Sequence, residues 1–232
     1  CLHRPDKEMF DRLNDACDGQ VKLITAACEE EGGMEFIGYA SQKCTVSLGH
    51  TSCTYDQAME AFARGASHAT HLFNGMDGLH HRKPGIVAAA MDAGASVELI
   101  CDGIHIHPSV IRLAHKLYGD RINLISDSMR CTGMPDGEYS LGGQPVTVKN
   151  GLPCISGTDT IAGSSLTMHK ALKNVIRFGI PLTDALYAAT TAPALAAGLK
   201  DVGALQVGKC ADILILDKHL NIKSVFIDGS AV

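Results

Sequence analysis

The sequence is poor in several features, and each absence restricts what the protein can be. It contains no Trp and only 5% aromatic residues, so Ala, Ile, Leu and Val must fill most of the core. No apolar run approaches the ~18 residues that a membrane span needs, and no signal peptide is recognisable. The formal net charge of −5 argues against a general nucleic-acid binder, whose surface is usually basic. We therefore expect neither a membrane nor a nucleic acid among its partners.

The cysteines also lack a pattern. Nine are scattered along the chain, with no CxxC pair and no regular spacing. An odd number of scattered cysteines in 232 residues fits reduced thiols better than a disulfide framework, which predicts a cytoplasmic protein. The sequence begins at Cys1 rather than at Met, and we expect it to be truncated at its N-terminus.

What is present is an alternation of short apolar runs with helical stretches. Helices are expected at residues 55–64, with Thr54 as N-cap, and at 109–118 after Pro108. Apolar runs that alternate with helices favour a parallel sheet. The expected strands are residues 21–27, 45–48, 68–73, 97–101 and 122–126.

A polar group follows each apolar run, in the order Glu29, His50, His71, Asp102 and Asp127. In a (β/α)8 barrel the carboxyl ends of all strands meet at one rim, where catalytic groups collect. A doubly wound sheet has one switch point and would not need a polar group after every strand. The sequence therefore predicts an α/β fold of the TIM-like barrel type, partial, with about five of its eight βα units.

The remainder of the chain has a different pattern. A hairpin is expected at residues 139–148 and helices at 164–178, 183–191 and 193–199. The tail predicts two strands, at 208–217 and 224–228, which would belong to a small β-sandwich domain. We therefore expect the barrel part to occupy residues 1–200 and the small β domain residues 201–232.

Three of the polar residues suit a hydrolytic metal site. Such a site needs neutral imidazoles as ligands, an open position and a carboxylate that moves protons. His50, His71 and Asp127 supply these groups from three different strand ends. A single His at a strand end is more often a structural residue, but three such residues in succession favour a common site.

Over essentially its whole length the chain resembles the N-acetylglucosamine-6-phosphate deacetylases, a family of the amidohydrolase superfamily. The resemblance rests on long motifs that occur in the family's order. They are Gly49-His50-Thr51, Thr70-His71-Leu72-Phe73-Asn74-Gly75-Met76, Asp102-Gly103-Ile104-His105, Ser126-Asp127-Ser128 and residues 134–143, 161–168 and 203–212.

The resemblance implies a role for each matching position. His50 and His71 match the two histidine metal ligands, and Asp127 matches the catalytic acid/base. Arg82 matches an arginine that binds phosphate across a homodimer interface. The remaining substrate-binding positions are Asn74, Gly75, Asp102, Gly103, Ile104, His105, Ile161, Ala162 and Gly163.

The implied reaction is metal-dependent hydrolysis of the acetamide of N-acetylglucosamine 6-phosphate, with one or two divalent ions, zinc or iron. The family's third ligand, a Glu in a Leu-Glu-Gly-Pro phrase, and the first-strand histidine pair of some members are absent; we expect both upstream of Cys1. Glu29 is a candidate replacement, although a structural role suits it better. Two alternatives stay open: another amidohydrolase, either an N-acetylgalactosamine-6-phosphate deacetylase or a dihydroorotase-like enzyme, and a non-catalytic fragment that lacks the metal-binding Glu.

Overall fold

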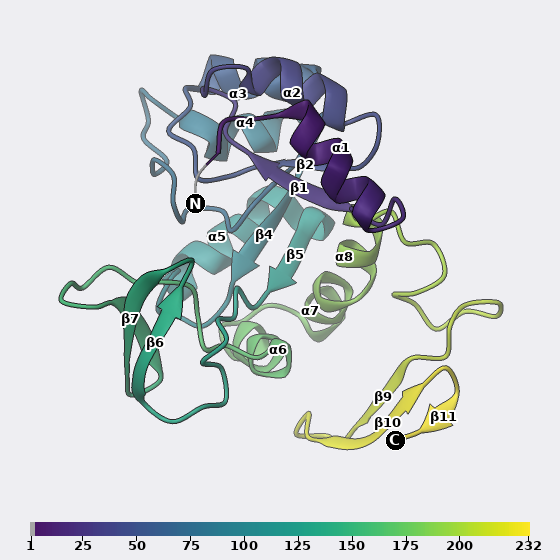
Figure 1. The fold of residues 1–232 in the computed structure, drawn as a ribbon. Helices are drawn as coiled ribbons and strands as arrows, with labels where there is room; N and C mark the ends of the chain where they lie inside the picture. The colour runs from purple at the N-terminus through teal and green to yellow at the C-terminus, as the bar shows by residue number, and fades with distance from the viewer. Residues whose placement is uncertain (1–2) are drawn as a thin grey trace.

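A five-stranded parallel sheet forms the centre of the computed structural model, which describes residues 3–232 (Figure 1). Its strands follow one another in chain order, so the sheet has no switch point. This order is the one a barrel requires, and it confirms the prediction of a partial (β/α)8-type barrel. The strands are β1 (Leu23–Ala26), β2 (Thr45–Leu48), β3 (Ala66–Ala69), β4 (Ser96–Ile100) and β5 (Ile122–Ile125).

Helices precede and connect these strands. At α3, Thr54 accepts a hydrogen bond from the backbone of Gln57, whose side chain accepts one from the Thr54 N–H; this capping box confirms the predicted N-cap. At α5, Pro108 is itself the first helical residue and His107 is the N-cap. The helices are α1 (Lys7–Ala16), α2 (Gly33–Ala40), α3 (Tyr55–Ala63), α4 (Gly85–Asp92) and α5 (Pro108–Tyr118), with a short 3₁₀ turn, η1 (Gly119–Arg121), before β5.

The strands of the sheet have two chemically different faces. On β2, Val46 and Leu48 belong to the main apolar cluster of buried residues from the sheet and its helices. Ser47, between them, points to the other face, since side chains alternate along a strand, and its hydroxyl lies 2.5 Å from that of Thr70. Thr70 also lies 2.8 Å from the Thr25 hydroxyl, so polar groups line this second face near the strand ends.

Strand β3 is shorter than the sequence predicted. The expected strand 68–73 ends at Ala69, and residues 70–73 form a turn in which His71 and Phe73 have positive φ angles. Left-handed residues cannot continue a β-strand. Leu72, the apolar residue directly after His71, is therefore buried as part of a turn and not as part of a strand.

Beyond β5 a separate antiparallel sheet contains three strands, where the sequence predicted only a hairpin: β6 (Gly137–Leu141), β7 (Gln144–Lys149) and β8 (Leu152–Ile155). Three helices follow: α6 (Met168–Arg177), α7 (Leu182–Ala189) and α8 (Thr191–Ala196). The helix expected from residue 164 begins only at Met168, because Ser164 pairs with Ser128 and Thr167 caps the helix.

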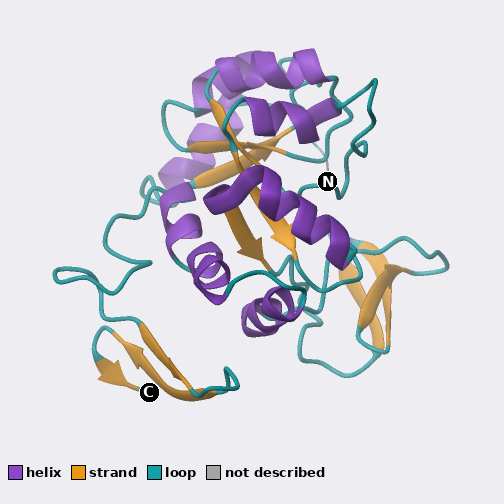
Figure 2. Cartoon of the chain, turned by 180° about the vertical axis from the view of Figure 1, so that it is seen from behind, coloured by secondary structure: helices purple, strands orange, loops and turns teal. Residues whose placement is uncertain are grey.

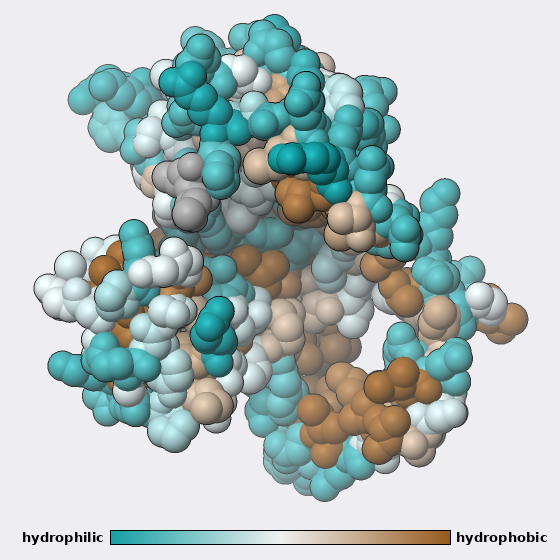
Figure 3. Space-filling model, in the orientation of Figure 1, coloured by the Kyte–Doolittle hydropathy of each residue, from teal (hydrophilic) through white to brown (hydrophobic). Residues whose placement is uncertain are grey.

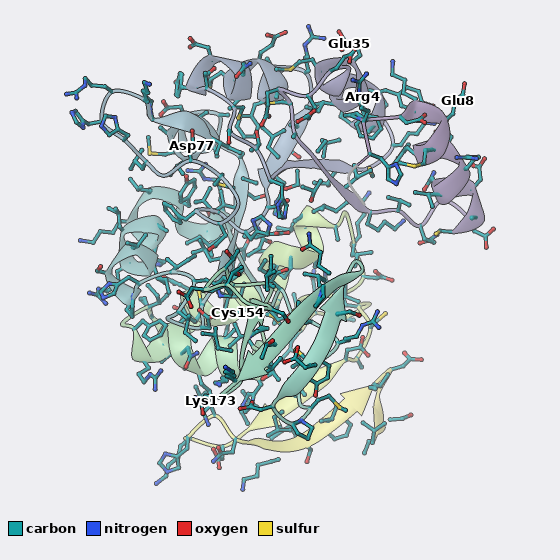
Figure 4. All side chains as sticks on the ribbon, turned by 60° about the vertical axis from the view of Figure 1, so that its left-hand side comes forward. Arg4, Glu8, Glu35, Asp77, Cys154 and Lys173 are labelled. Carbon is teal, nitrogen blue, oxygen red and sulfur yellow. The ribbon has the colours of Figure 1, made fainter. Side chains whose placement is uncertain are left out.

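The C-terminal residues form a second small antiparallel sheet of β9 (Ile213–Leu216), β10 (Ile222–Ile227) and a short β11 (Ser230–Ala231) that the sequence did not predict. Figures 1 and 2 show this sheet set apart from the parallel sheet, with a long loop leading to it from α8. Its β9–β10 turn contacts α6: Lys173, labelled in Figure 4, donates to the Asn221 side chain at 3.1 Å, and His169 Nε2 lies 2.6 Å from the Leu220 carbonyl oxygen.

Among the described residues, none of the helices has the length and apolar character required to cross a bilayer.

Candidate metal and catalytic site

Two histidines meet at the carboxyl ends of neighbouring strands. His50 follows β2 and His71 follows β3, and their Nε2 atoms are 2.9 Å apart. The two rings are nearly perpendicular, with centroids 4.6 Å apart. Two imidazole nitrogens that share one ion at about 2.1 Å each would lie roughly 3.0–3.4 Å apart, close to the observed separation. The pair therefore fits two ligands of a single divalent ion.

His50, His71 and Asp127 share an unusual backbone conformation. Their φ angles are +49°, +29° and +49°, in a region that residues other than glycine rarely adopt. Such strain costs on the order of 1–3 kcal/mol at each position and persists where surrounding contacts hold it, most often at functional sites. All three positions follow strands of the same sheet, so the strained backbone lies at one rim.

Gly75 makes room for the histidine pair. A Cβ atom at this position would lie 3.1 Å from His50 Nδ1 and 3.5 Å from His71 Cε1, and the φ angle of +59° also favours glycine. The Gly75 carbonyl accepts a hydrogen bond from the Thr51 N–H at 3.1 Å, which ties the loop after β3 to the end of β2. The backbone at Gly75 therefore approaches both rings closely, and a larger residue would press on them.

Asp127 is held by the chain segment that precedes α6. Its carbonyl accepts the Ser164 N–H at 2.7 Å, and the Ser164 hydroxyl donates to the carbonyl of Ser126. A Cβ on Gly163 would lie 3.2 Å from the Asp127 carbonyl oxygen and 2.8 Å from Met129 Cγ, so glycine permits this close pairing. Sequence reasoning did not identify Ser164, whose only signal was its place in a motif.

The site electrostatics suit metal ligation and proton transfer. Burial, and then the neighbouring His71, lower the pKa of His50 below that of free histidine, which favours the neutral imidazole that metals bind. Burial raises the pKa of Asp127 above its ordinary value, although His71, His105 and His50 act in the opposite direction. The Nδ1 atom of His71 is buried and has no hydrogen-bond partner among the described residues.

Within residues 3–232, no third thiol, carboxylate or imidazole joins the two histidines at ligand spacing. Glu29 is engaged elsewhere: it accepts hydrogen bonds from the Thr51 hydroxyl and, at 2.6 Å, from the Ser52 N–H. These contacts agree with the structural role that the sequence favoured for Glu29.

Asp102 organises the turn after β4. Its carboxylate accepts the N–H groups of Ile104 and His105 at 2.8 and 2.9 Å and lies 2.7 Å from His105 Nδ1. Gly103 occupies this turn with a positive φ, and Ile104 is exposed. The contact with Asp102 involves Nδ1 of His105 and not its Nε2. His105 is also close enough to Asp127 to lower the pKa of that carboxyl.

The other expected substrate residues are dispersed around the site. Asn74 turns its amide back to the carbonyls of His71 and Leu72, both at 3.2 Å. Ile161 and Ala162 precede Gly163, and Ala162 is buried beside the β6–β8 sheet. Arg82 is exposed on the loop that also carries Asp77, labelled in Figure 4, and its guanidinium contacts His81 at 2.7 Å. The side-chain contact of Arg82 thus lies within its own loop and does not involve His50 or His71.

Sequence reasoning also missed a buried polar network behind His71. Glu98 accepts the His71 N–H at 3.1 Å and lies 3.2 Å from His68 Nε2. His68 Nδ1 in turn lies 2.5 Å from the Ser96 hydroxyl. His68 and Glu98 each lie on a strand of the parallel sheet, and only the pairing of β3 with β4 brings them together.

His50 also lines a cavity of ≈490 Å³, a volume within the ordinary range for small-molecule sites. The ends of β1 and β2 line one side of it, with Gly49 and His50. The segment that enters α1 lines the other side, with Arg4 and Asp6. His50 is thus one of the residues that line this cavity.

A parallel sheet that carries imidazoles and a carboxylate at its carboxyl rim is typical of the metal-dependent hydrolases built on barrels. The model of the amidohydrolase family matches residues 40–232. The chain belongs to the amidohydrolase family, whose members typically bind metals.

Several characterised proteins are similar to the chain. It is 38% identical over 219 residues to the N-acetylglucosamine-6-phosphate deacetylase of Vibrio furnissii, covering 93% of this chain and 55% of that protein. It is 36% identical over 224 residues to the N-acetylgalactosamine-6-phosphate deacetylase of Escherichia coli O157:H7, covering 95% of this chain and 59% of that protein. The chain thus spans somewhat more than half the length of these relatives.

Solved structures show the same similarity in three dimensions. The crystal structure of N-acetyl-D-glucosamine-6-phosphate deacetylase from Mycobacterium smegmatis superimposes with a TM-score of 0.93 at 36% identity, covering 100% of this chain and 63% of that one. A β-aspartyl dipeptidase from Fervidobacterium islandicum AW-1, at 16% identity and a TM-score of 0.57, shares the fold alone.

Proposed function

We propose that this protein hydrolyses the acetamide of an N-acetylated amino-sugar 6-phosphate, and that its substrate is N-acetylglucosamine 6-phosphate. The products would be glucosamine 6-phosphate and acetate. The reaction would be a step of amino-sugar catabolism. The observation that carries the proposal is the juxtaposition of the His50 and His71 Nε2 atoms at the rim that also bears Asp127. The names of the relatives from Vibrio furnissii and Mycobacterium smegmatis support the substrate.

His50 and His71 would hold a divalent cation, for which we propose zinc or iron. When bound, such an ion supplies Lewis acidity toward the acetamide carbonyl and toward water. Asp127 would accept a proton from the attacking water and later donate it to the departing nitrogen. Burial raises the pKa of Asp127, which makes the second transfer easier than it would be for a fully exposed carboxylate.

The sugar phosphate would lie along the rim. Gly75 and Asn74 would border it on the side of β3, Asp102, Gly103, Ile104 and His105 on the side of β4, and Ile161, Ala162 and Gly163 beyond Asp127. Arg82 is exposed and contacts its own loop, so we propose that it binds the phosphate of a substrate held by a second copy, in a homodimer. We also propose a cytoplasmic location, since all eight described cysteines are free thiols.

Asp127→Asn tests the proposed reaction most directly. The amide retains the shape of the carboxylate but cannot shuttle a proton, so acetate release from N-acetylglucosamine 6-phosphate should fall by roughly 10²–10⁴-fold. Substrate binding, measured by calorimetry, should stay nearly unchanged. An Asp127→Asn protein with close to full turnover would rule out this role for Asp127.

Arg82→Ala tests phosphate recognition. The loss of a charge-assisted bond to phosphate should raise KM for the phosphorylated sugar much more than for N-acetylglucosamine. Lys83→Ala, which removes an exposed cation from the same loop, is a matched control. Equal losses on both sugars would remove Arg82 from phosphate binding, and a monomer in sedimentation analysis would contradict the shared site.

The galactosamine epimer is a second candidate substrate, because the relative from Escherichia coli O157:H7 is named for it at 36% identity. Comparison of kcat/KM for the two N-acetylated sugar phosphates decides between them. A preference for the galactosamine compound would change the substrate while leaving the proposed roles of His50, His71 and Asp127 intact.

A further inference from the structure

A second group of side chains of the types that bind metals lies on the loops after β1 and β2. Cys28 and Glu29 follow β1, and Cys53 follows β2. The Sγ atoms of the two cysteines and one carboxylate oxygen of Glu29 lie within 4.8 Å of one another. Both thiols are almost fully buried, with Cys28 2% and Cys53 3% exposed. Neither cysteine takes part in the proposed deacetylation.

The spacing of these atoms fits a soft divalent cation. Zinc binds thiolate sulfur at about 2.3 Å, so two thiolates on one tetrahedral ion lie about 3.8 Å apart. Small side-chain movements bring the three ligand atoms to this spacing from within 4.8 Å. A pair of thiolates with one carboxylate selects zinc or cadmium over magnesium or calcium, which prefer all-oxygen sites.

Neighbouring groups already orient the three ligands. The Glu29 carboxylate accepts the Thr51 hydroxyl through one oxygen and the Ser52 N–H, at 2.6 Å, through the other. The Thr51 hydroxyl also accepts the Cys53 N–H at 3.2 Å. Hydrogen bonds of this kind fix the ligands in many metal sites, and here they all involve the segment directly after His50.

We propose that Cys28, Glu29 and Cys53 form a structural site for a soft divalent cation, with zinc as the occupant. The ion would tie the loop after β1 to the loop after β2. Because Thr51 is bonded to Glu29 and follows His50 in the chain, the same ion would hold the backbone of the catalytic rim. This site is separate from the one formed by His50 and His71.

A disulfide between the same two cysteines is the competing outcome. Its formation by exchange requires an accessible thiolate, and both sulfurs are buried. Burial of both residues therefore limits oxidation by exchange, and their spacing with Glu29 suits a shared cation.

Cadmium titration of the purified, metal-stripped and reduced protein tests the site. Cadmium–thiolate bonds absorb in the ultraviolet, whereas cadmium bound to imidazole does not show this band. We expect a saturable thiolate band in the wild type. Cys28→Ser and Cys53→Ser should each remove about half of it and weaken binding at least ~10-fold, and the double variant should show none. Zinc should raise the melting temperature of the wild type more than that of the double variant.

Matched variants separate this site from its surroundings. Cys131→Ser replaces an equally buried thiol outside the cluster, and it should leave the band intact. Glu29→Gln should weaken binding, whereas Glu30→Gln, at the exposed neighbouring position, should not. The band should persist in His71→Ala, which distinguishes this site from the proposed catalytic one.

Three results would overturn the proposal. The first is a wild-type protein with no thiolate band, and the second is a band that survives in the Cys28→Ser, Cys53→Ser double variant. The third is a Cys28–Cys53 disulfide found by peptide mapping in protein purified without reductant, combined with no cadmium binding after reduction. The third result would identify the pair as redox-active.

Discussion

The parallel sheet and the C-terminal antiparallel sheet contain the same kinds of apolar residues but use them differently. Ile100 on β4 has no exposed surface, whereas Ile215 on β9 is 48% exposed. Figure 3 shows an apolar patch over the C-terminal sheet, where Leu214, Ile222 and Ile227 are also exposed. An apolar, β-branched pattern therefore predicts a strand in both regions, but it does not predict whether other elements cover the strand.

The candidate site residues lie in only one of these two regions. His50, His71 and Asp127 each come directly after a strand of the parallel sheet, whose side chains are fixed by packing. We propose that residues 201–232 are part of a small β domain that supports the barrel without taking part in the chemistry. The contacts of Lys173 and His169 with the β9–β10 turn are the links available for such support.

Matched truncations of isoleucine measure this difference directly. Ile100→Ala should lower the free energy of unfolding by about 2–5 kcal/mol, because it leaves a cavity in a packed core. Ile215→Ala should change it by no more than about 0.5 kcal/mol, as expected at an exposed position. Urea denaturation of both variants gives the comparison. Similar losses in the two would mean that the C-terminal sheet is as tightly packed as the parallel one.

Removal of the Glu98 carboxylate should have the next largest effect. Glu98→Ala leaves the His71 N–H and the buried His68 without their partner, which should cost about 1.5–3 kcal/mol of stability. Glu98→Gln keeps one acceptor and should lose less. Thermal unfolding and zinc affinity of both variants provide the measurement, and an Ala variant as stable as the wild type would show that the network does not support His71.

Two glycines of the loop after β3 offer the finest comparison. Gly75→Ala should cost about 1–2 kcal/mol for the left-handed backbone alone, and its methyl group would also press on the His50 ring. The loss should appear as lower metal affinity as well as lower stability. Gly78→Ala is the control, since nothing lies within 4 Å of its Cβ position. Equal behaviour of the two variants would contradict the close contact between Gly75 and the histidine rings.

The sequence by itself was sufficient for the fold class and for most strands of the parallel sheet. Apolar runs with a polar group after each one identified the strands of the parallel sheet and its fold class, because these signals are local. The motif around Thr54 was enough to locate the start of α3, since a capping box lies within four residues. By contrast, the short strands β8 and β11 have weak local patterns, and they exist because a neighbouring strand offers hydrogen-bond partners.

Only the tertiary structure decided which distant residues meet. His68 had no context in the sequence, yet strand pairing sets it beside Glu98 and behind His71. Ser164 was expected in a helix, but pairing with Ser128 places it against Asp127. Cys28 and Cys53 are separated by a helix and a strand, and the register of β1 with β2 brings their sulfurs together. Sequence patterns report local preference, whereas such contacts depend on the register and packing of whole elements.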